Sequence, residues 1–568
     1  MELFDACCYI GRWPSEQLAF ATVEGLLAEM DRLGIGRALV THTLAWQNVP
    51  AVGNAHLMEE IAGHPLLEPC WVVMPGETET GGPTREVEAL CETMAAQNVR
   101  AVRLCPRDHV YPLADWMAGD LLAALADRRY LVLLDLDQVV LPTGLFDVNP
   151  AGWRDVAWLC QAFPSLSVVL TKVGYRALRV LPFLMQDCPN LFLDLSYFAT
   201  HQGVEEITAT LGAERLLFGT NQPLTDPGGA LTRLLYAEIT ADQREMIAHG
   251  NLERLLDRVS GVGHRPAQSP VEGVPDRPPI TIANSGPDSS QEQGEQASGH
   301  KSADLAALVQ AGRSLSESGL EIIDAHGHVG PYRNFYIPNP SADSIVRTMD
   351  RCGIARACLS SNMAIGPDWV TGNRLTAEAV ATYPERLIGH AVANPNEPER
   401  IRSELTYAFD ELGLKAIKLH PDLHAHPIGG EGYQPAWEFA AERGCLVLSH
   451  TFHGSRYCDP TAFGPLAERY PQVPIILLHS GSMTAAFEGA IALARQHANL
   501  YLYLSGSYIT GPWIARMVSE AGAERVIFSS DIPFIDLRYS LGRVVFAQLT
   551  LEEQKLVLGG NIRRLMGL

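Results

Sequence analysis

The chain has 568 residues, of which 47% are hydrophobic, and its 65 acidic side chains outnumber the 43 basic ones, giving a formal net charge of −22. Domains usually contain about 100 to 250 residues, so this length predicts two large domains. The acidity disfavours a nucleic-acid partner, and no apolar run reaches the roughly 18 residues that a membrane span needs.

The N-terminus and the cysteines bear on the cellular compartment. Residues 1–5 contain neither a basic region nor a long apolar stretch, so they do not resemble a signal peptide. The eleven cysteines form no CxxC pair, which favours buried thiols over disulfides or a thiolate metal site. We therefore expect a cytoplasmic protein that neither crosses a membrane nor binds nucleic acid.

The two halves of the chain repeat one another. Residues 3–11 align with residues 322–330, and residues 30–35 with residues 349–354, both at an offset of 319. Further matches follow in the same order at offsets that fall to 307, as between residues 168–174 and 475–481. A colinear repeat of this kind predicts a duplication and one fold shared by both halves.

A stretch rich in Pro, Ser, Gly, Gln and Glu separates the halves. It covers residues 262–303 and contains hardly any apolar residues. Such a composition cannot form a packed core and is typical of a disordered linker. The predicted domains are therefore residues 1–261 and residues 304–568.

Within each half, short runs of Val, Ile and Leu alternate with helical segments such as 341–352, 399–412 and 434–443. This alternation is typical of parallel strands joined by helices. The strands predicted in the second half are 321–325, 357–360, 387–393, 416–420, 445–450, 474–479, 500–504 and 525–530. Eight strands in about 250 residues match a TIM barrel, so the predicted fold class is α/β, with two tandem (β/α)8 TIM barrels; a doubly wound sheet is the alternative.

Polar residues in the second half follow the strands at their C-terminal ends, where TIM barrels carry their sites. His326 and His328 point to the same side because side chains alternate along a strand. Beyond this pair, the strand ends carry Lys418, His420, His450, His479 and Asp531. Imidazoles and a carboxylate buried together need partners, which predicts one divalent metal ion, Zn²⁺ first, with Fe²⁺, Mn²⁺ and Co²⁺ as alternatives.

The pattern of an HxH after the first strand, a histidine after the fifth and the sixth, and Asp-x-Pro after the eighth resembles the amidohydrolase superfamily, in particular its amidohydrolase-related branch. That branch contains metal-dependent hydrolases and non-oxidative decarboxylases similar to aminocarboxymuconate-semialdehyde decarboxylase. The resemblance covers residues 321–568, where every motif residue is present. In the first half it extends only to the general pattern of the sequence. It implies that His326, His328, His450 and Asp531 bind one metal ion, and that His479 hydrogen-bonds the metal-bound water or the substrate.

These residues suit a metal-activated water. A bound dication lowers the pKa of water from 15.7 to about 7, so hydroxide becomes available at neutral pH. Asp531 could then take the proton, and His479 could stabilise an oxyanion or protonate the leaving group.

Other polar residues are candidates for substrate contacts. Lys418 is expected to bind a substrate carboxylate, with His420 on the same face, and a role for Lys418 in bridging two metals is the alternative. Arg456 lies in the loop after the fifth strand, as does His453, and His424 and His426 follow the fourth. His390 falls inside a strand and is predicted to be a satisfied core histidine.

The first half has lost the motif residues. Cys7, Tyr9, Asp135, Lys172 and Asn221 stand where the second half has His326, His328, His450, His479 and Asp531. At about 5 Å and an effective dielectric near 20, the Lys172 ammonium would repel a dication by roughly 7 kcal/mol. We expect a degenerate barrel without metal, in which Arg103 and Lys172 pair with Asp135.

The predicted function is that of a metal-dependent hydrolase acting on a small amide or lactone through the second barrel. A decarboxylase of an aromatic or unsaturated acid is the alternative, and a non-catalytic binding or scaffold protein is the alternative from another class. The expected partner is a small-molecule substrate. The two barrels are expected to pack as an intramolecular pseudo-dimer, with further homo-oligomerisation left open.

Overall fold

The computed structural model describes residues 1–14, 18–76, 87–136, 152–262 and 304–568. The chain divides into two compact units, Met1–Thr281 and Ile282–Leu568. Apart from its first residue, the predicted linker of residues 262–303 lies outside the described residues. The domain boundaries at residues 261 and 304 therefore stay a prediction.

Each unit contains eight parallel strands in sequential order. In the first unit they are β1 (Phe4–Ile10), β2 (Arg37–His42), β3 (Leu67–Val72), β4 (Ala101–Leu104), β5 (Leu131–Asp135), β6 (Ser167–Thr171), β7 (Leu191–Asp194) and β8 (Leu216–Leu217). In the second they are β9 (Ile322–Val329), β10 (Ile354–Ser361), β11 (Leu387–Val392), β12 (Ala416–Leu419), β13 (Val447–His450), β14 (Ile475–Leu478), β15 (Leu500–Tyr503) and β16 (Val526–Ile527). The eight strands predicted for the second half are all present, with ends that differ by a few residues.

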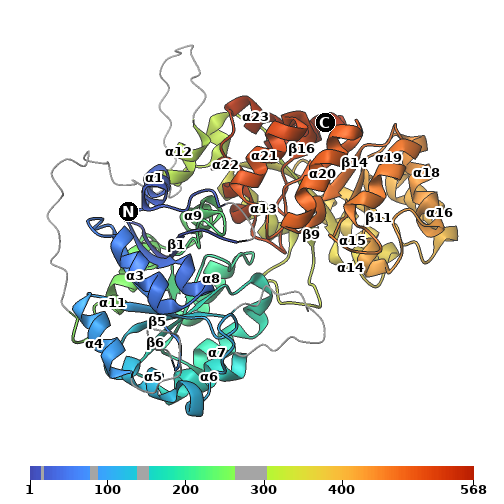
Figure 1. Ribbon diagram of the computed structural model, residues 1–568. Helices are drawn as coiled ribbons and strands as arrows, with labels where there is room; N and C mark the ends of the chain where they lie inside the picture. Colours follow the sequence, from blue (N-terminus) through green and yellow to red (C-terminus); the bar gives the residue numbers. More distant parts are fainter. Residues whose placement is uncertain (15–17, 77–86, 137–151, 263–303) are drawn as a thin grey trace, which may run out of the picture. The chain divides into compact units, whose positions relative to one another are not determined.

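Helices alternate with these strands and surround them in each unit (Figure 1). The main helices of the first unit are α1 (Val23–Leu33), α3 (Pro50–Glu60), α4 (Glu88–Ala96), α5 (Asp115–Asp127), α6 (Trp153–Ala162), α7 (Leu181–Asp187), α8 (Gly203–Leu211) and α9 (Pro227–Leu235). Those of the second are α13 (Ala342–Cys352), α15 (Trp369–Thr382), α16 (Pro398–Asp410), α18 (Gln434–Arg443), α19 (Gly464–Arg469), α20 (Thr484–Gln496), α21 (Gly511–Ala521) and α22 (Leu537–Val545). Helix α13 shows why they form here: Ser341 caps its first turn, and Ile345, Val346 and Met349 lie buried along one side.

Backbone hydrogen bonds close each sheet into a barrel. The amide of Ala6 donates to the carbonyl of Phe218 at 2.9 Å, and the amide of Ala325 donates to the carbonyl of Phe528 at 3.2 Å. In the second unit, strands β9, β13, β14 and β16 share a buried apolar cluster with Ile562 of α24 (Asn561–Met566). The predicted fold of two tandem (β/α)8 barrels is confirmed.

Two further expectations concern the cysteines and the membrane. All eleven cysteines are free and buried, as their spacing predicted. Among the described residues, no helix has both the length and the apolar character required to cross a membrane.

Candidate metal centre

Three donor side chains meet at the C-terminal end of the second barrel. His326 and His328 come from β9, and Asp531 follows β16; each offers one ligand atom, and these atoms lie within 4.8 Å of one another. All three residues are buried. Gly327 permits this approach, since a Cβ there would lie 2.6 Å from the carbonyl oxygen of Ile532. Two imidazoles and one carboxylate form a donor set that suits a divalent metal ion.

The two histidines are held in the form that binds metals. Burial is the main cause that lowers the pKa of both His326 and His328, so both rings are neutral at pH 7. The Nδ1 atom of His328 lies 3.2 Å from the hydroxyl of Ser360, and its Nε2 atom lies 3.5 Å from Oδ1 of Asp531. Neither ring nitrogen of His326 has a hydrogen-bond partner among the described residues. Buried nitrogens of this kind fit metal ligation.

Asp531 is held as a carboxylate. Burial raises its pKa, but the hydrogen bond from His328 and the positive charge of Lys418 outweigh burial, and its pKa lies below the usual value. Its backbone is in the left-handed region, with φ of 66°, which turns the residue after β16 toward β9. Asp531 is therefore ionised at neutral pH and can act as a ligand or as a base.

His479 follows β14 and points into the same mouth. Its Nδ1 atom lies 2.9 Å from the hydroxyl of Ser505, and its ring centre lies 5.0 Å from that of His450. Burial lowers its pKa to about 4, so the imidazole is neutral at pH 7. The contact with Ser505 fixes the ring and leaves Nε2 available for another partner.

Lys418 of β12 supplies a cation to this mouth. It is 1% exposed, and burial lowers its pKa to about 7 despite the nearby charge of Asp531. A buried ammonium group with a pKa near 7 is readily stabilised by an anionic ligand. The position of Lys418 thus suits the carboxylate-binding role that the sequence predicts for it.

His450 and His420 form a second group beside the three donors. Their rings stack with centres 4.2 Å apart, and Nε2 of His450 lies 3.7 Å from Oδ2 of Asp422. Among the described residues, the three-donor cluster does not include His450. Its role as a fourth ligand stays a prediction. Asp422 lies in α17 (Pro421–His424), and the sequence analysis missed it, although a carboxylate in the loop after a barrel strand is a usable signal.

Arg456 lies apart from these groups. Its side chain is exposed, and its guanidinium lies over the ring of Tyr457, 4.6 Å from the ring centre. His453, in the same loop, lies 3.9 Å from Asp459. A contact between Arg456 and the substrate therefore stays a prediction.

Two features of the mouth escaped the sequence analysis. His390 is fully buried and stacks on His326 with ring centres 5.9 Å apart, but neither of its nitrogens has a partner among the described residues. The expectation of a satisfied core histidine was wrong in that respect. The second feature is aromatic: Phe534 stacks on His328 with centres 4.7 Å apart, and Tyr332 lies 4.7 Å from Phe534.

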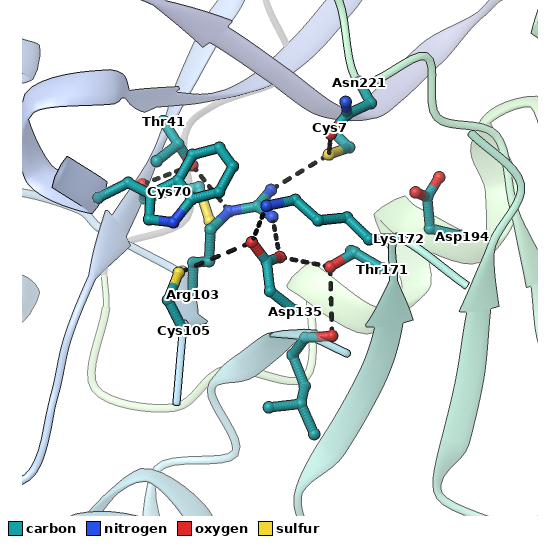
Figure 2. Close-up of polar contacts among 12 residues, drawn as sticks. Cys7, Thr41, Cys70, Arg103, Cys105, Asp135, Thr171, Lys172, Asp194 and Asn221 are labelled. Atoms are coloured by element: carbon teal, nitrogen blue, oxygen red, sulfur yellow. Dashed lines mark hydrogen bonds and ion pairs between the residues drawn. The ribbon is translucent and has the colours of Figure 1, made fainter. Parts of the chain in front are cut away.

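The mouth of the first barrel holds an ion-pair cluster instead (Figure 2). Asp135 lies 2.5 Å from Arg103 and 2.7 Å from Lys172, which confirms the predicted pairing. The guanidinium of Arg103 also donates to Cys7 at 3.2 Å, and the Lys172 ammonium lies 3.2 Å from the centre of the Trp46 ring. All these groups are buried. The cations therefore have partners within the protein.

Among the described residues, no donor cluster lies at this first mouth. One other donor group occurs in the part of the chain that the structure describes, formed by Glu2, His249 and Glu253. Glu2 precedes β1 and is exposed, so this group lies at the opposite rim of the barrel.

Comparisons with solved structures found several similar chains, each matching less than half of this chain. A 5-carboxyvanillate decarboxylase from Sphingomonas paucimobilis is 17% identical, with 44% of this chain and 99% of that chain covered and a TM-score of 0.35. A 2,6-dihydroxybenzoate decarboxylase from Rhizobium is 19% identical, with the same coverage and a TM-score of 0.35. A dihydroxybenzoic acid decarboxylase from Polaromonas, solved with bound manganese, is 21% identical, with 44% and 97% covered and a TM-score of 0.34.

No curated protein matches this chain. The family model described as amidohydrolase matches twice, over residues 5–258 and over residues 323–568, one match for each barrel. Since the two matches span most of the chain and coincide with the two observed barrels, the protein belongs to the amidohydrolase family, as a tandem duplication.

Proposed function

We propose that the second barrel is a metal-dependent lyase that releases CO₂ from a small aromatic or unsaturated carboxylic acid. The observation that carries this proposal is the buried Lys418 ammonium in the same mouth as the three-donor cluster. Together with a dication, it would make this mouth attractive to a carboxylate. Phe534 and Tyr332 add an aromatic wall beside His328 on which a planar group can pack.

The residues present fit a resident metal ion. His326, His328 and Asp531 would hold it, with His450 proposed as a further ligand. We propose Zn²⁺ first, because imidazole with one carboxylate suits zinc, with Mn²⁺ as the alternative. When bound, the ion would supply positive charge to the substrate's oxygen atoms and acidify a water molecule.

The chain's own residues would do the rest. Lys418 would pair with the substrate carboxylate, and the aromatic wall would orient the ring. Asp531 and His479 would hold and move a proton at the substrate carbon. The bond between this carbon and the carboxyl carbon would break, its electron pair would form the new C–H bond, and CO₂ would leave.

Hydrolysis of an amide or lactone is the second candidate. The observation that favours it is the lowered pKa of Asp531, which keeps a carboxylate base ionised at neutral pH. Asp531 would take a proton from water as the water oxygen bonds to the carbonyl carbon, and His479 would stabilise the developing oxyanion. The C–N or C–O bond would then break, and the proton held by Asp531 would pass to the leaving nitrogen or oxygen. The same residues thus serve both reactions, which differ in the bond that breaks.

A single assay series separates the candidates. The purified chain is loaded with Zn²⁺ or Mn²⁺ and incubated with 5-carboxyvanillate, 2,6-dihydroxybenzoate, simple lactones and aryl amides; the first two are the compounds in the names of the solved structures above. Release of CO₂ that disappears in Lys418→Met and in Asp531→Asn would support the lyase. Acid formation from a lactone or an amide without CO₂ would support the hydrolase, and a metal-loaded chain inactive on all of them would favour a binding role.

A further inference from the structure

Asp422 is a carboxylate beside the mouth of the second barrel that the proposed reaction does not use. It lies in α17, the short helix that follows β12, and its side chain is half-buried. Its Oδ2 atom lies 3.7 Å from the Nε2 atom of His450, which ends the neighbouring strand β13. A carboxylate that faces one nitrogen of a metal-binding histidine determines which nitrogen is left for the metal.

Two donors from the loop after β13 hold Asp422 in place. The Ser455 hydroxyl oxygen accepts from the backbone amides of Tyr457 and Cys458 at 3.0 and 3.3 Å, so its hydrogen is donated to Oδ1 of the carboxylate at 2.6 Å. The buried Cys458 thiol donates to Oδ2 at 3.2 Å. Burial and the charge of Asp422 raise the pKa of this thiol, which therefore stays protonated. Since the carboxylate only accepts, a further polar neighbour at Oδ2 has to be a donor.

The ring of His450 is held by stacking. It lies on the ring of His420 with centres 4.2 Å apart and an angle of 13° between the planes. The His420 ring is fixed in turn, because its Nδ1 atom accepts from the backbone amide of Leu423 at 3.4 Å. His479, in the mouth, lies beside His450 with ring centres 5.0 Å apart. The ring that Asp422 faces is thus supported by a second imidazole.

The position of Asp422 decides the tautomer of His450. A histidine binds a metal as the neutral ring, which carries one hydrogen. With a carboxylate at Nε2, that hydrogen belongs on Nε2 and the free lone pair on Nδ1. The separation of 3.7 Å is longer than a hydrogen bond, and such contacts are often long in a free protein and tighten when its ligands bind.

The first barrel has lost the carboxylate together with the histidine. Arg107 and Asp135 occupy the positions of Asp422 and His450, both at an offset of 315. Asp135 is paired with Arg103 and Lys172 instead. A carboxylate at the position of Asp422 therefore accompanies a histidine at the end of the fifth strand.

We propose that Asp422 is a positioning residue of the metal centre, which fixes the Nε2–H tautomer of His450 and makes Nδ1 its ligand atom. This inference rests on the proposed function in that His450 is a ligand of the metal ion. Ser455 and Cys458 hold the carboxylate in the required orientation.

The affinity of the purified full chain for Zn²⁺ tests this role. It is measured by competition with a chelator for the wild type, Asp422→Ala, Asp422→Asn and Glu431→Ala; Glu431 is an exposed carboxylate in the same loop. Asp422→Ala should weaken Zn²⁺ binding by ~10- to 100-fold, the typical effect of losing a carboxylate behind a metal-binding histidine. Asp422→Asn keeps the shape and one acceptor oxygen, so its affinity should lie between the two, and Glu431→Ala should match the wild type.

Nitrogen-15 NMR of the histidine-labelled, Zn²⁺-loaded chain gives a readout that a purely structural role would not move. His450, identified by the signals missing from His450→Gln, should carry its hydrogen on Nε2. This hydrogen should exchange with water faster in Asp422→Ala, or in Asp422→Asn if the alanine variant does not fold.

Three outcomes would overturn the positioning role: a hydrogen on Nδ1 of His450, an unchanged Zn²⁺ affinity in the folded Asp422 variants, or a His450→Gln chain that binds Zn²⁺ as tightly as the wild type. CO₂ release is scored separately. A wild type that shows the expected tautomer and the expected dependence on Asp422 without decarboxylation would overturn the proposed reaction and leave the role of Asp422 standing.

Discussion

The two barrels keep the same internal supports but differ in the chemistry of their mouths. In both, a buried aspartate on the first strand fastens the segment after the eighth: Asp5 accepts from the Thr220 amide at 3.0 Å, and Asp324 from the Ser530 amide at 2.9 Å. A matched asparagine, Asn251 or Asn561, bonds to two backbone carbonyls near the eighth strand. The duplication thus preserved the bonds that close the barrel.

The backbone of the mouth is preserved as well. His479 and its counterpart Lys172 both lie in the left-handed region, with φ of 63° and 57°, and so do Asp531 and Asn221, with φ of 66° and 55°. This conformation is unfavourable for residues other than glycine. This backbone conformation persists in the first barrel, where Lys172 and Asn221 replace His479 and Asp531. It is therefore a feature of the barrel fold and not of the metal site alone.

Hydroxyl groups at matched positions serve different partners. Ser360 contacts Nδ1 of the predicted ligand His328 at 3.2 Å, whereas Thr41, its counterpart, accepts from Nε of Arg103 at 3.3 Å. Ser505 contacts His479, whereas the matched Ser196 donates to Asp194. One scaffold therefore supports either a metal-donor cluster or an ion-pair cluster, and a few side chains decide which.

The largest expected effect is on metal content. The His326→Ala, His328→Ala double variant should lose the metal of the whole chain, because the first barrel has no donor cluster at its mouth in the described residues. The wild type should hold about one metal ion per chain by elemental analysis. The Cys7→Ala variant, as a control in the first barrel, should keep that metal. Two tightly bound ions per wild-type chain would contradict the division between the barrels.

The next effect is on turnover. Asp531→Asn and His479→Asn should each reduce kcat by ~10² to 10⁴, the typical contribution of a general acid or base. Asp531→Asn should also weaken metal binding, whereas Lys172→Asn, the matched change in the first barrel, should leave turnover intact. Near-normal rates from either second-barrel variant, with an unchanged circular dichroism spectrum, would refute the assigned roles.

A third prediction concerns the stability of the first barrel. Asp135→Ala should lower its free energy of unfolding by ~3–5 kcal/mol, because two buried cations lose their carboxylate. Urea denaturation measures this loss, and metal analysis should show the second barrel unaffected. Asp120→Ala, an exposed carboxylate on α5, is the matched control and should change little. An equal effect of the two substitutions would contradict the importance of the cluster.

The stability that these ion pairs of Asp135 supply should depend on pH. Burial raises the pKa of Asp135, but Arg103 and Lys172 outweigh it and hold the pKa well below its usual range. A carboxyl group with a depressed pKa contributes stability above its unfolded pKa of about 3.9, and the contribution is lost as the pH falls through the folded value. The advantage of the wild type over Asp135→Asn should therefore be constant from pH 7 to about pH 5 and shrink below about pH 4.

The smallest expected effect concerns the predicted pseudo-dimer. If the first barrel serves as a packing partner at high effective concentration, residues 304–568 expressed alone should self-associate or aggregate. Light scattering coupled to size-exclusion chromatography measures this. A stable and fully active monomer of residues 304–568 would count against the pairing of the barrels.

The residues alone were enough to predict the duplication, both barrels and the strand ends that carry the polar residues. It also predicted the ion pairs of Asp135, because Arg103, Asp135 and Lys172 end three neighbouring parallel strands about 4.8 Å apart. Strand periodicity decides on which face a side chain lies, and that was sufficient to predict these ion pairs.

The division of the histidines into groups could not be predicted without the three-dimensional contacts. His326 and His328 lie with Asp531, whereas His450 stacks on His420 and faces Asp422. Periodicity does not specify side-chain rotamers or the course of the loops, and these place Asp422 beside His450. The unpartnered nitrogens of His390 became visible only when its neighbours were known, since the satisfaction of a buried polar group depends on contacts between residues that are distant in the chain.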